Sequence, residues 1–137
     1  MPLTANIKGS GSSAARVIST TALRASAILT NSYVNSSSLA TDGANQLILL
    51  LSATLGSLVS IEVKVEFSDD NATWYQETFG AISGGTSTLD LGEHEIIVDG
   101  NYRIPLPLSD RFIRVAAKGT GTLTSSLLAI DGILGVS

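Results

Sequence analysis

The feature that most constrains the fold of this chain is a two-residue alternation of side chains in "SIEVKVEF", residues 60–67. Successive side chains of a β-strand point to opposite faces. The apolar set is Ile61, Val63, Val65 and Phe67, and the charged set is Glu62, Lys64 and Glu66. The pattern predicts a half-buried strand. "RFIRVAAK", residues 111–118, predicts a second one, with Ile113, Val115 and Ala117 on its apolar side.

Three further segments are compatible with strands. "YRIPLPL", residues 102–108, contains two prolines that cannot donate ladder hydrogen bonds, so it predicts an edge strand or an extended connection. "QLILLLSA", residues 46–53, is apolar on both faces. It predicts a central strand covered on both sides or a strand whose outer face meets another subunit, although its pattern also allows a short buried helix. "ARVISTTALRASAILTNSYV", residues 15–34, allows strands or one or two helical turns.

Clusters of turn-forming residues recur at strand-length spacing, in "TDGAN", "SDDNA", "SGGTS", "DGN" and "KGTGT". Many short strands separated by such turns predict an all-β fold. We expect an antiparallel β-sandwich of jelly-roll or immunoglobulin-like type. A length of 137 residues fits a single domain. We expect the sandwich to span residues 14–137. Residues 1–13 contain "GSGSS" and few bulky apolar groups, and we expect an extended N-terminal arm that reaches a neighbouring subunit.

Composition narrows the class of partner. Apolar residues make up 44% of the chain and charged residues only 15%, against ~25% in a typical soluble domain. A surface with so few charges favours a protein that packs against other subunits. The net charge of −4 and eight scattered Lys and Arg residues predict no nucleic-acid binding. We also expect no membrane span and no secretory signal, because the apolar runs are short and no basic segment precedes one.

The cluster "SDDN", residues 68–71, raises the question of a calcium site. Calcium requires six to eight oxygen ligands presented at set positions, and the D-x-[DN]-x-[DN]-G pattern of calcium loops is missing here. Asp and Asn also favour tight turns, because their side chains bond to the nearby backbone. We therefore predict a hairpin turn, after which Trp74 and Tyr75 begin the return strand.

Candidate catalytic groups are few. The chain has no cysteine, which excludes thiolate catalysis and disulfides. His94 is the only histidine, and no G-x-S-x-G motif accompanies it, so we interpret it as an exposed residue of an edge strand. Glu93 and Glu95 flank it at a spacing that resembles a glycosidase pair but is typical of any solvated strand face. The sequence thus predicts neither an enzyme nor a bound metal or cofactor.

Six residues are candidates for contact with a protein partner. Arg111 and Arg114 are suited to an acidic partner surface, or alternatively to pairing with Asp110 or with glutamates of a neighbouring strand. The terminal run "LLAIDGILGVS" forms either a closing core strand or an apolar surface for another subunit. The candidates are Leu3, Ile7, Arg111, Arg114, Leu134 and Val136.

Two segments together carry a resemblance to a known family. They are "VKVEFSDDNATWYQETF" and "SDRFIRVAAKGTGTLTSSLLAIDGIL", and the similarity covers roughly residues 45 to 137. The pairing resembles small β-sandwich virion proteins of tailed phages, especially capsid decoration (cement) proteins. The resemblance implies a homo-oligomer, a dimer or trimer, made in the host cytoplasm and bound to the major capsid protein on the outer surface of the virion. It implies no catalytic residue.

The same segments also resemble discoidin-type carbohydrate-binding domains. That resemblance implies a glycan- or surface-binding module on a virion or tail, with loops near Trp74 and Tyr75 as the binding site. The chain departs from those domains in lacking cysteines and in having only seven aromatic residues. Assembly on a capsid therefore remains the first functional expectation.

Overall fold

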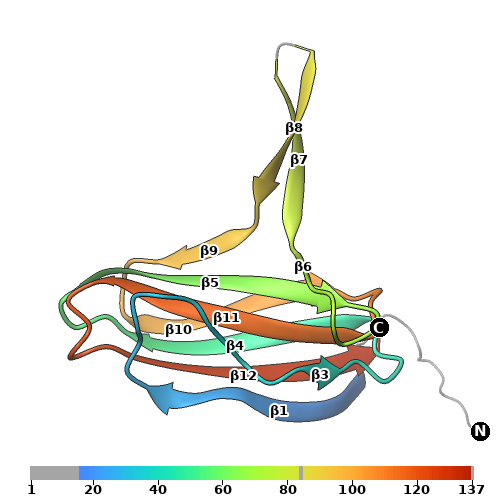
Figure 1. The fold of residues 1–137 in the computed structure, drawn as a ribbon. Helices are drawn as coiled ribbons and strands as arrows, with labels where there is room; N and C mark the ends of the chain where they lie inside the picture. The colour runs from blue at the N-terminus through green and yellow to red at the C-terminus, as the bar shows by residue number, and fades with distance from the viewer. Residues whose placement is uncertain (1–15, 84, 137) are drawn as a thin grey trace, which may run out of the picture.

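A computed structural model describes residues 16–83 and 85–136 (Figure 1). These residues form antiparallel β-sheets that pack as a sandwich, so the predicted all-β fold is confirmed. No helix in these two ranges is long and apolar enough to cross a membrane. The expected arm, residues 1–13, lies outside the described residues.

The first sheet, called sheet A here, contains the two longest apolar stretches of the sequence. Its strands in spatial order are β1 (Arg16–Ala27), β12 (Leu127–Val136), β4 (Gln46–Thr54) and β10 (Gly100–Pro107). Strand β4 is therefore central in its sheet and not a helix, but no described residue covers its outer face, where Leu50 is 39% exposed, so the predicted cover on both sides is not found there. Strand β10 is an edge strand, which is one of the two outcomes its prolines predicted. Within the 15–34 segment, residues 16–27 form β1 rather than helical turns.

The second sheet, sheet B, is built around β5 and β11, the two strands with the clearest alternation. Its order is β2 (Val34–Asn35), β11 (Phe112–Gly121), β5 (Leu58–Ser68) and β6 (Tyr75–Gln76). Two more strands extend its edges: β3 (Leu39–Ala40) pairs with β11, and β9 (Glu93–Ile96) pairs with β5. The alternation places the predicted apolar side chains inward, and Ile61, Val63 and Val65 are each 0% exposed.

The core lies between the inner faces of the two sheets. Sheet A contributes every second residue of β4 and β12, and sheet B contributes every second residue of β5 and β11. Leucine, isoleucine and valine make up almost all of it. Because branched aliphatic side chains fill the space between face-packed sheets well, this composition specifies a sandwich rather than a water-filled barrel.

A separate hairpin of β7 (Thr78–Ser83) and β8 (Thr86–Leu91) stands out from the sandwich (Figure 1). It interrupts a single edge strand, because β6 and β9 both lie along β5. At its base the backbone N–H of Glu77 donates to the carbonyl of Val65 at 3.0 Å, and the N–H of Gly92 donates to the carbonyl of Glu77 at 2.7 Å. A Cβ at Gly92 would lie 2.9 Å from that same carbonyl oxygen, so the base requires glycine.

Candidate interaction surfaces

The "SDDN" cluster forms the predicted turn, and its oxygens are engaged by the chain itself. Asp70 Oδ1 accepts hydrogen bonds from the backbone N–H groups of Ala72 (2.9 Å) and Thr73 (2.8 Å). Asn71 adopts a positive φ of 59°, a conformation that asparagine tolerates. These hydrogen bonds lower the pKa of Asp70 below its usual value. Among the described residues, no group of three or more acidic or histidine side chains is arranged to hold a metal ion.

A second acidic pair lies beside this turn. Burial and the nearby Asp69 carboxylate, which also hydrogen-bonds to Asp110, raise the pKa of Asp110 above its usual value. The loop that carries Asp110 also contains Arg111, which is exposed and whose carbonyl accepts from the backbone N–H of Thr41 at 2.9 Å. This end of the sandwich is thus polar and acidic.

Arg114 is occupied within the outer face of sheet B. Its Nε donates to Glu66 Oε1 at 2.7 Å, and its guanidinium lies 4.3 Å from the centre of the Trp74 ring. Glu66 lies opposite Arg114 in the β5–β11 register, so this is the cross-strand pairing considered as an alternative for Arg114. The stacked indole shields the ion pair from water.

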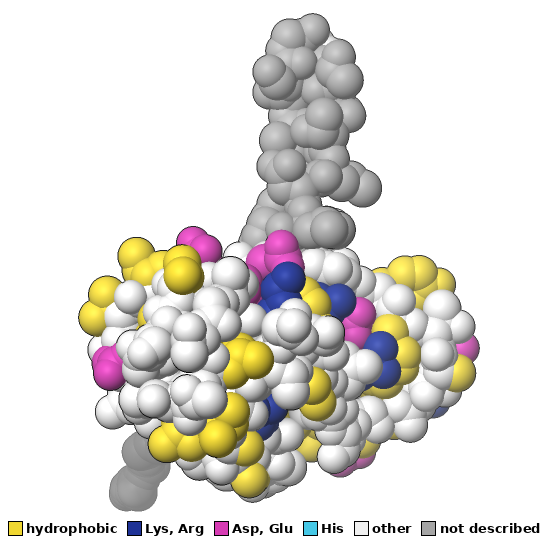
Figure 2. Space-filling view, turned by 60° about the vertical axis from the view of Figure 1, so that its left-hand side comes forward, with side chains coloured by type: hydrophobic (Ala, Val, Ile, Leu, Met, Phe, Trp, Pro, Cys, Tyr) yellow, Lys and Arg dark blue, Asp and Glu magenta, His cyan; other side chains and the backbone are white. Residues whose placement is uncertain are grey.

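Tyr33 covers the other half of the same face. Its ring lies 4.5 Å from Lys64 Nζ and 4.9 Å from Lys118 Nζ, and its hydroxyl donates to Glu93. Burial, the hydrogen bond to Glu93 and the neighbouring carboxylates raise the pKa of Tyr33. Lys64, Glu66 and Arg114 of sheet B therefore pair with one another beside the rings of Tyr33 and Trp74. Figure 2 shows Lys, Arg, Asp and Glu side chains of both signs close together near the foot of the hairpin.

Trp74 and Tyr75 do not form a shared platform for a sugar. Trp74 and Tyr75 are adjacent in an extended segment, so their side chains point in different directions. One face of Trp74 is engaged with Arg114, while Tyr75 stands 67% exposed. Of the two rings expected to stack on a sugar near these loops, only that of Tyr75 is left largely exposed.

His94 differs from the exposed residue that the sequence predicted. It is on an edge strand, β9, as expected, but it is half-buried, and its Nε2 lies 3.2 Å from Glu77 Oε1. This contact links β9 to the chain just after β6, across the base of the hairpin. Glu93 is bound to Tyr33, and Glu95 is exposed. The histidine thus has a structural partner that explains its position.

An apolar patch marks the end of the sandwich opposite the acidic turn. Three contacts bring its loops together: Leu55 N–H donates to Asp99 at 2.8 Å, Leu29 N–H donates to Ser126 at 3.1 Å, and Gly56 lies directly against Ser125. Large hydrophobic side chains are exposed around these loops, and together we call them the end patch. They are Ile28 (54%), Val59 (70%), Ile97 (66%), Val98 (63%) and Leu127 (43%). Figure 2, which turns this end toward the viewer, shows hydrophobic side chains in several patches.

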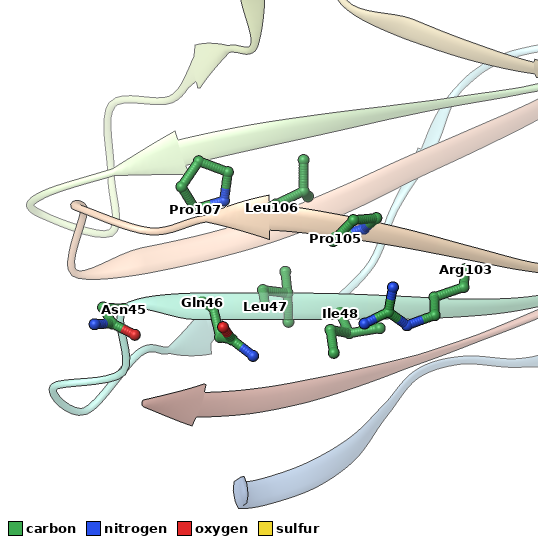
Figure 3. Close-up of a pocket in the computed structure, with 8 residues that line it drawn as sticks. All are labelled: Asn45, Gln46, Leu47, Ile48, Arg103, Pro105, Leu106 and Pro107. Carbon is green, nitrogen blue, oxygen red and sulfur yellow. The ribbon is translucent and has the colours of Figure 1, made fainter. Parts of the chain in front are cut away.

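The outer face of sheet A forms a second apolar surface. Leu50 on β4 is 39% exposed, and the neighbouring outward positions include Ile48 and Ile133, which are half-buried. A hollow of about 270 Å³ runs along β4 and β10 (Figure 3). Figure 3 shows Arg103 reaching from β10 over β4, with Ile48 and Pro105 beside it. No described residue of the chain covers this face.

The six candidate partner residues fall in different places. Leu3 and Ile7 lie outside the described residues. Arg111 is exposed at the acidic end, Arg114 is paired in sheet B, and Val136 is half-buried at the end of β12. Leu134 is 1% exposed and belongs to the core, so the terminal run closes the sandwich, as the first of its two interpretations predicted. Its outward residues Ala129 and Ile133 still face away from the core.

Sequence reasoning missed the residues that distinguish the two sheets. Tyr33 showed no local signal, because its lysine partners come from β5 and β11. The sequence analysis did not single out Arg103 or Asp131. The prolines of "YRIPLPL" were a usable signal, since they identified the edge strand on which Arg103 lies.

Comparisons with known proteins identify the fold only. No protein-family model matches the chain. No curated protein matches it either. Among solved structures the chain is similar to the PBSX exported protein XepA, with a TM-score of 0.56 and 12% sequence identity over 90% of this chain and 37% of that one. The chain therefore spans a little over a third of the length of XepA, and at this identity the likeness shows a shared β-sandwich fold.

Proposed function

We propose that this chain is a structural virion protein that decorates and stabilises an icosahedral phage capsid by binding the major capsid protein and itself. The observation that carries the proposal is the end patch, which exposes five large hydrophobic side chains at one end of a rigid sandwich. Several large exposed hydrophobic side chains gathered at one end of a domain are a feature of protein–protein contact sites. The shared fold with an exported protein of the phage PBSX supports a phage structural role.

The chemistry of the described surfaces supports assembly rather than catalysis. The charged groups of sheet B pair with one another, and His94 pairs with Glu77 across a hairpin base. The end patch offers a partner apolar area, whose burial contributes about 25 cal/mol per Å² before ordering costs. Each subunit that binds an assembled shell but not its dissociated subunits stabilises the shell by mass action.

Cosedimentation with capsids assembled without this protein tests the proposal. The wild-type chain should bind saturably and raise the temperature at which the capsids disassemble. The double substitution Ile97→Ser and Val98→Ser should weaken binding at least tenfold, because it removes two exposed apolar side chains from the end patch. Deletion of residues 1–13 should also weaken binding if the arm reaches a neighbour, and circular dichroism should show that both variants remain folded.

Tyr75→Ser is the matched control, because Tyr75 is equally exposed but lies beside the acidic turn. It should bind capsids as the wild type does. A wild-type chain that does not bind capsids at any attainable concentration would overturn the proposal. Binding that Tyr75→Ser abolishes and the Ile97/Val98 variant retains would move the contact to the other end of the sandwich.

A further inference from the structure

The outer face of sheet A carries an ordered row of one cation, one apolar residue and one anion. The registers pair Arg103 on β10 with Leu50 on β4, and Leu50 with Asp131 on β12. The three residues are exposed, and directly paired residues of neighbouring strands point to the same face. Arg103 and Asp131 therefore flank Leu50 on either side, one strand spacing away in each direction.

The neighbouring rows are apolar or small. Pro105, Ile48 and Ile133 form the next row in one direction, and Asn101, Ser52 and Ala129 form the row in the other. A hollow of about 380 Å³ lies over this row, and Leu50, Arg103 and Asp131 are among the residues that line it. A hollowed sheet face can receive side chains of another sheet that packs against it.

The charges in this row have no partner inside the described part of the chain. The ion pairs found there join Lys64 and Arg114 to Glu66, and His94 to Glu77, and all of them lie in sheet B or at its edge. No hydrogen bond within the same residues engages the guanidinium of Arg103 or the carboxylate of Asp131. The outer face of sheet A thus presents one positive and one negative side chain at a fixed separation, whereas Lys64, Glu66 and Arg114 of sheet B form ion pairs with one another.

We propose that the outer face of sheet A binds a second copy of this chain about a two-fold axis parallel to β4. Such an axis exchanges the two sides of the sheet and places β10 of one copy over β12 of the other. Arg103 of each copy then faces Asp131 of its partner, and the two Leu50 side chains meet at the centre. A two-fold axis across the strands would instead oppose Arg103 to Arg103 and Asp131 to Asp131, so the charges select the first arrangement.

The dimensions fit this occupant. Face-packed sheets lie ~10 Å apart, a separation that a long arginine and a short aspartate side chain together span. The overlapping strands cover about 400 to 500 Å² per copy, from a strand spacing of ~4.8 Å and a rise of ~3.3 Å per residue. Interfaces of this size lie at the lower limit for specific complexes, so we expect a dimer that dissociates at micromolar concentrations.

This inference extends the proposed function. It rests on that proposal for the reason why the chain would bind a second copy of itself. It assigns self-association to sheet A, whereas the end patch is assigned to the capsid. Its test uses the purified chain without capsids. Loss of dimerisation and loss of capsid binding are therefore separate outcomes.

Sedimentation equilibrium of charge-reversal variants tests the proposal. The wild type should show a monomer–dimer equilibrium. Arg103→Asp and Asp131→Arg should each weaken it about ten- to a hundredfold, because each places like charges opposite one another twice per dimer. The double variant Arg103→Asp/Asp131→Arg should restore it, since each pair is then reversed on both sides.

A mixture of the two single variants gives the most direct test of the Arg103–Asp131 contact. One copy then has two acidic groups in the row and the other has two basic groups, so a heterodimer should form although neither variant dimerises alone. Native mass spectrometry distinguishes the heterodimer by its mass. Arg111→Asp and Glu95→Arg are the matched controls, because they make the same charge changes at exposed positions outside sheet A.

Three results would each overturn the proposal. A wild-type chain that stays monomeric at millimolar concentration would show that the face serves another partner. Dimerisation or trimerisation that neither reversal alters would place the contact elsewhere. Single variants that lose dimerisation but form no heterodimer would show that the two charges do not face each other. Thermal melts of each variant check that its fold is retained.

Discussion

Single buried hydroxyl groups hold the loops of this sandwich to one another. Ser126 is 0% exposed, and its Oγ accepts from the backbone N–H of Leu29 at 3.1 Å and donates to the carbonyl of Leu123 at 2.6 Å. It thereby ties the segment after β1 to the loop between β11 and β12. This junction also carries the end patch, so its rigidity bears on the proposed capsid contact.

We expect Ser126→Ala to lower the free energy of unfolding by about 1 to 3 kcal/mol, because it leaves the buried Leu29 N–H without an acceptor. Urea denaturation at neutral pH measures this change. Ser125→Ala is the control, since Ser125 is exposed and its hydroxyl makes no hydrogen bond within the described residues. Equal stability of the two variants would mean that water replaces the Ser126 hydroxyl at this site.

Asp70 makes a pH-dependent contribution to stability. Backbone hydrogen bonds from Thr73 and Ala72 hold the pKa of its carboxyl below the usual value. A carboxyl with a lowered pKa stabilises the fold at pH values above its unfolded pKa of ~3.9, and this contribution is lost as the pH falls through the folded pKa. The turn is therefore expected to weaken in acid.

The prediction is that Asp70→Asn unfolds at lower urea concentration than the wild type at pH 7, and that the gap narrows by pH 3. The physical reason is that the wild-type carboxylate becomes protonated over that range while the amide does not change. Denaturation midpoints at several pH values give the comparison. Asp42→Asn is the matched control, because Asp42 is exposed and its carboxylate receives no hydrogen bond within the described residues. A gap that stays constant with pH would contradict the prediction.

At the level of elements, the β7–β8 hairpin is an insertion in an otherwise continuous edge strand. Glu77 lies opposite Val65, and Glu93 lies opposite Lys64, so consecutive positions of β5 bind the chain before and after the hairpin. The hairpin strands pair with each other and with no other described strand. An isolated two-stranded hairpin adds little stability by itself, so its retention points to a role outside the fold.

A direct connection from Glu77 to Glu93, which deletes residues 78–92, should therefore leave the sandwich folded, with a melting temperature within a few degrees of the wild type. If the hairpin contacts a neighbour on the capsid, the same variant should cosediment less with capsids. Calorimetry and cosedimentation measure the two effects. Loss of the folded state would show that the hairpin is an integral part of sheet B, and full capsid binding would exclude the hairpin from the contact.

At the level of the whole molecule, the sandwich separates its surfaces by chemistry. Sheet B carries an ion pair beside Trp74 and lysines beside Tyr33, and the outer face of sheet A carries the charged row at its centre. One end of the sandwich is acidic and the other end is apolar. A subunit that must contact both a shell and its own copies needs distinct surfaces for the two contacts. The end patch and the outer face of sheet A are two such surfaces. None of the row residues Leu50, Arg103 and Asp131 belongs to the end patch.

The fold was largely predictable because its signals are local. The alternation in β5 and β11, the prolines of β10 and the turn residues around Asp70 and Asn71 each specify a strand face, an edge or a turn within a few residues. The segment that forms β1 was ambiguous, because threonine and alanine permit both helix and strand. Its pairing with β12 over the length of sheet A decides the outcome.

The candidate surfaces were less predictable. The end patch brings together residues from loops near positions 28, 59, 97 and 127, and no sequence window contains two of these regions. His94 was expected to be exposed, but Glu77 approaches it because the intervening hairpin leaves and rejoins the same edge of β5. Local sequence patterns show which side of a strand is apolar. They do not show which side chains of other strands lie next to it.

By itself the sequence determined the class of fold, the inward faces of the strands and the Asp–Asn turn, because period-two alternation and side-chain-to-backbone bonding act over a few neighbouring residues. Only the tertiary structure decided that residues 50, 103 and 131 form one row, that Glu66 and Arg114 of sheet B pair with each other, and that Arg103 and Asp131 find no partner among the described residues. The register between strands far apart in the chain depends on how their inner faces pack across the core, and this packing sets which outer side chains meet.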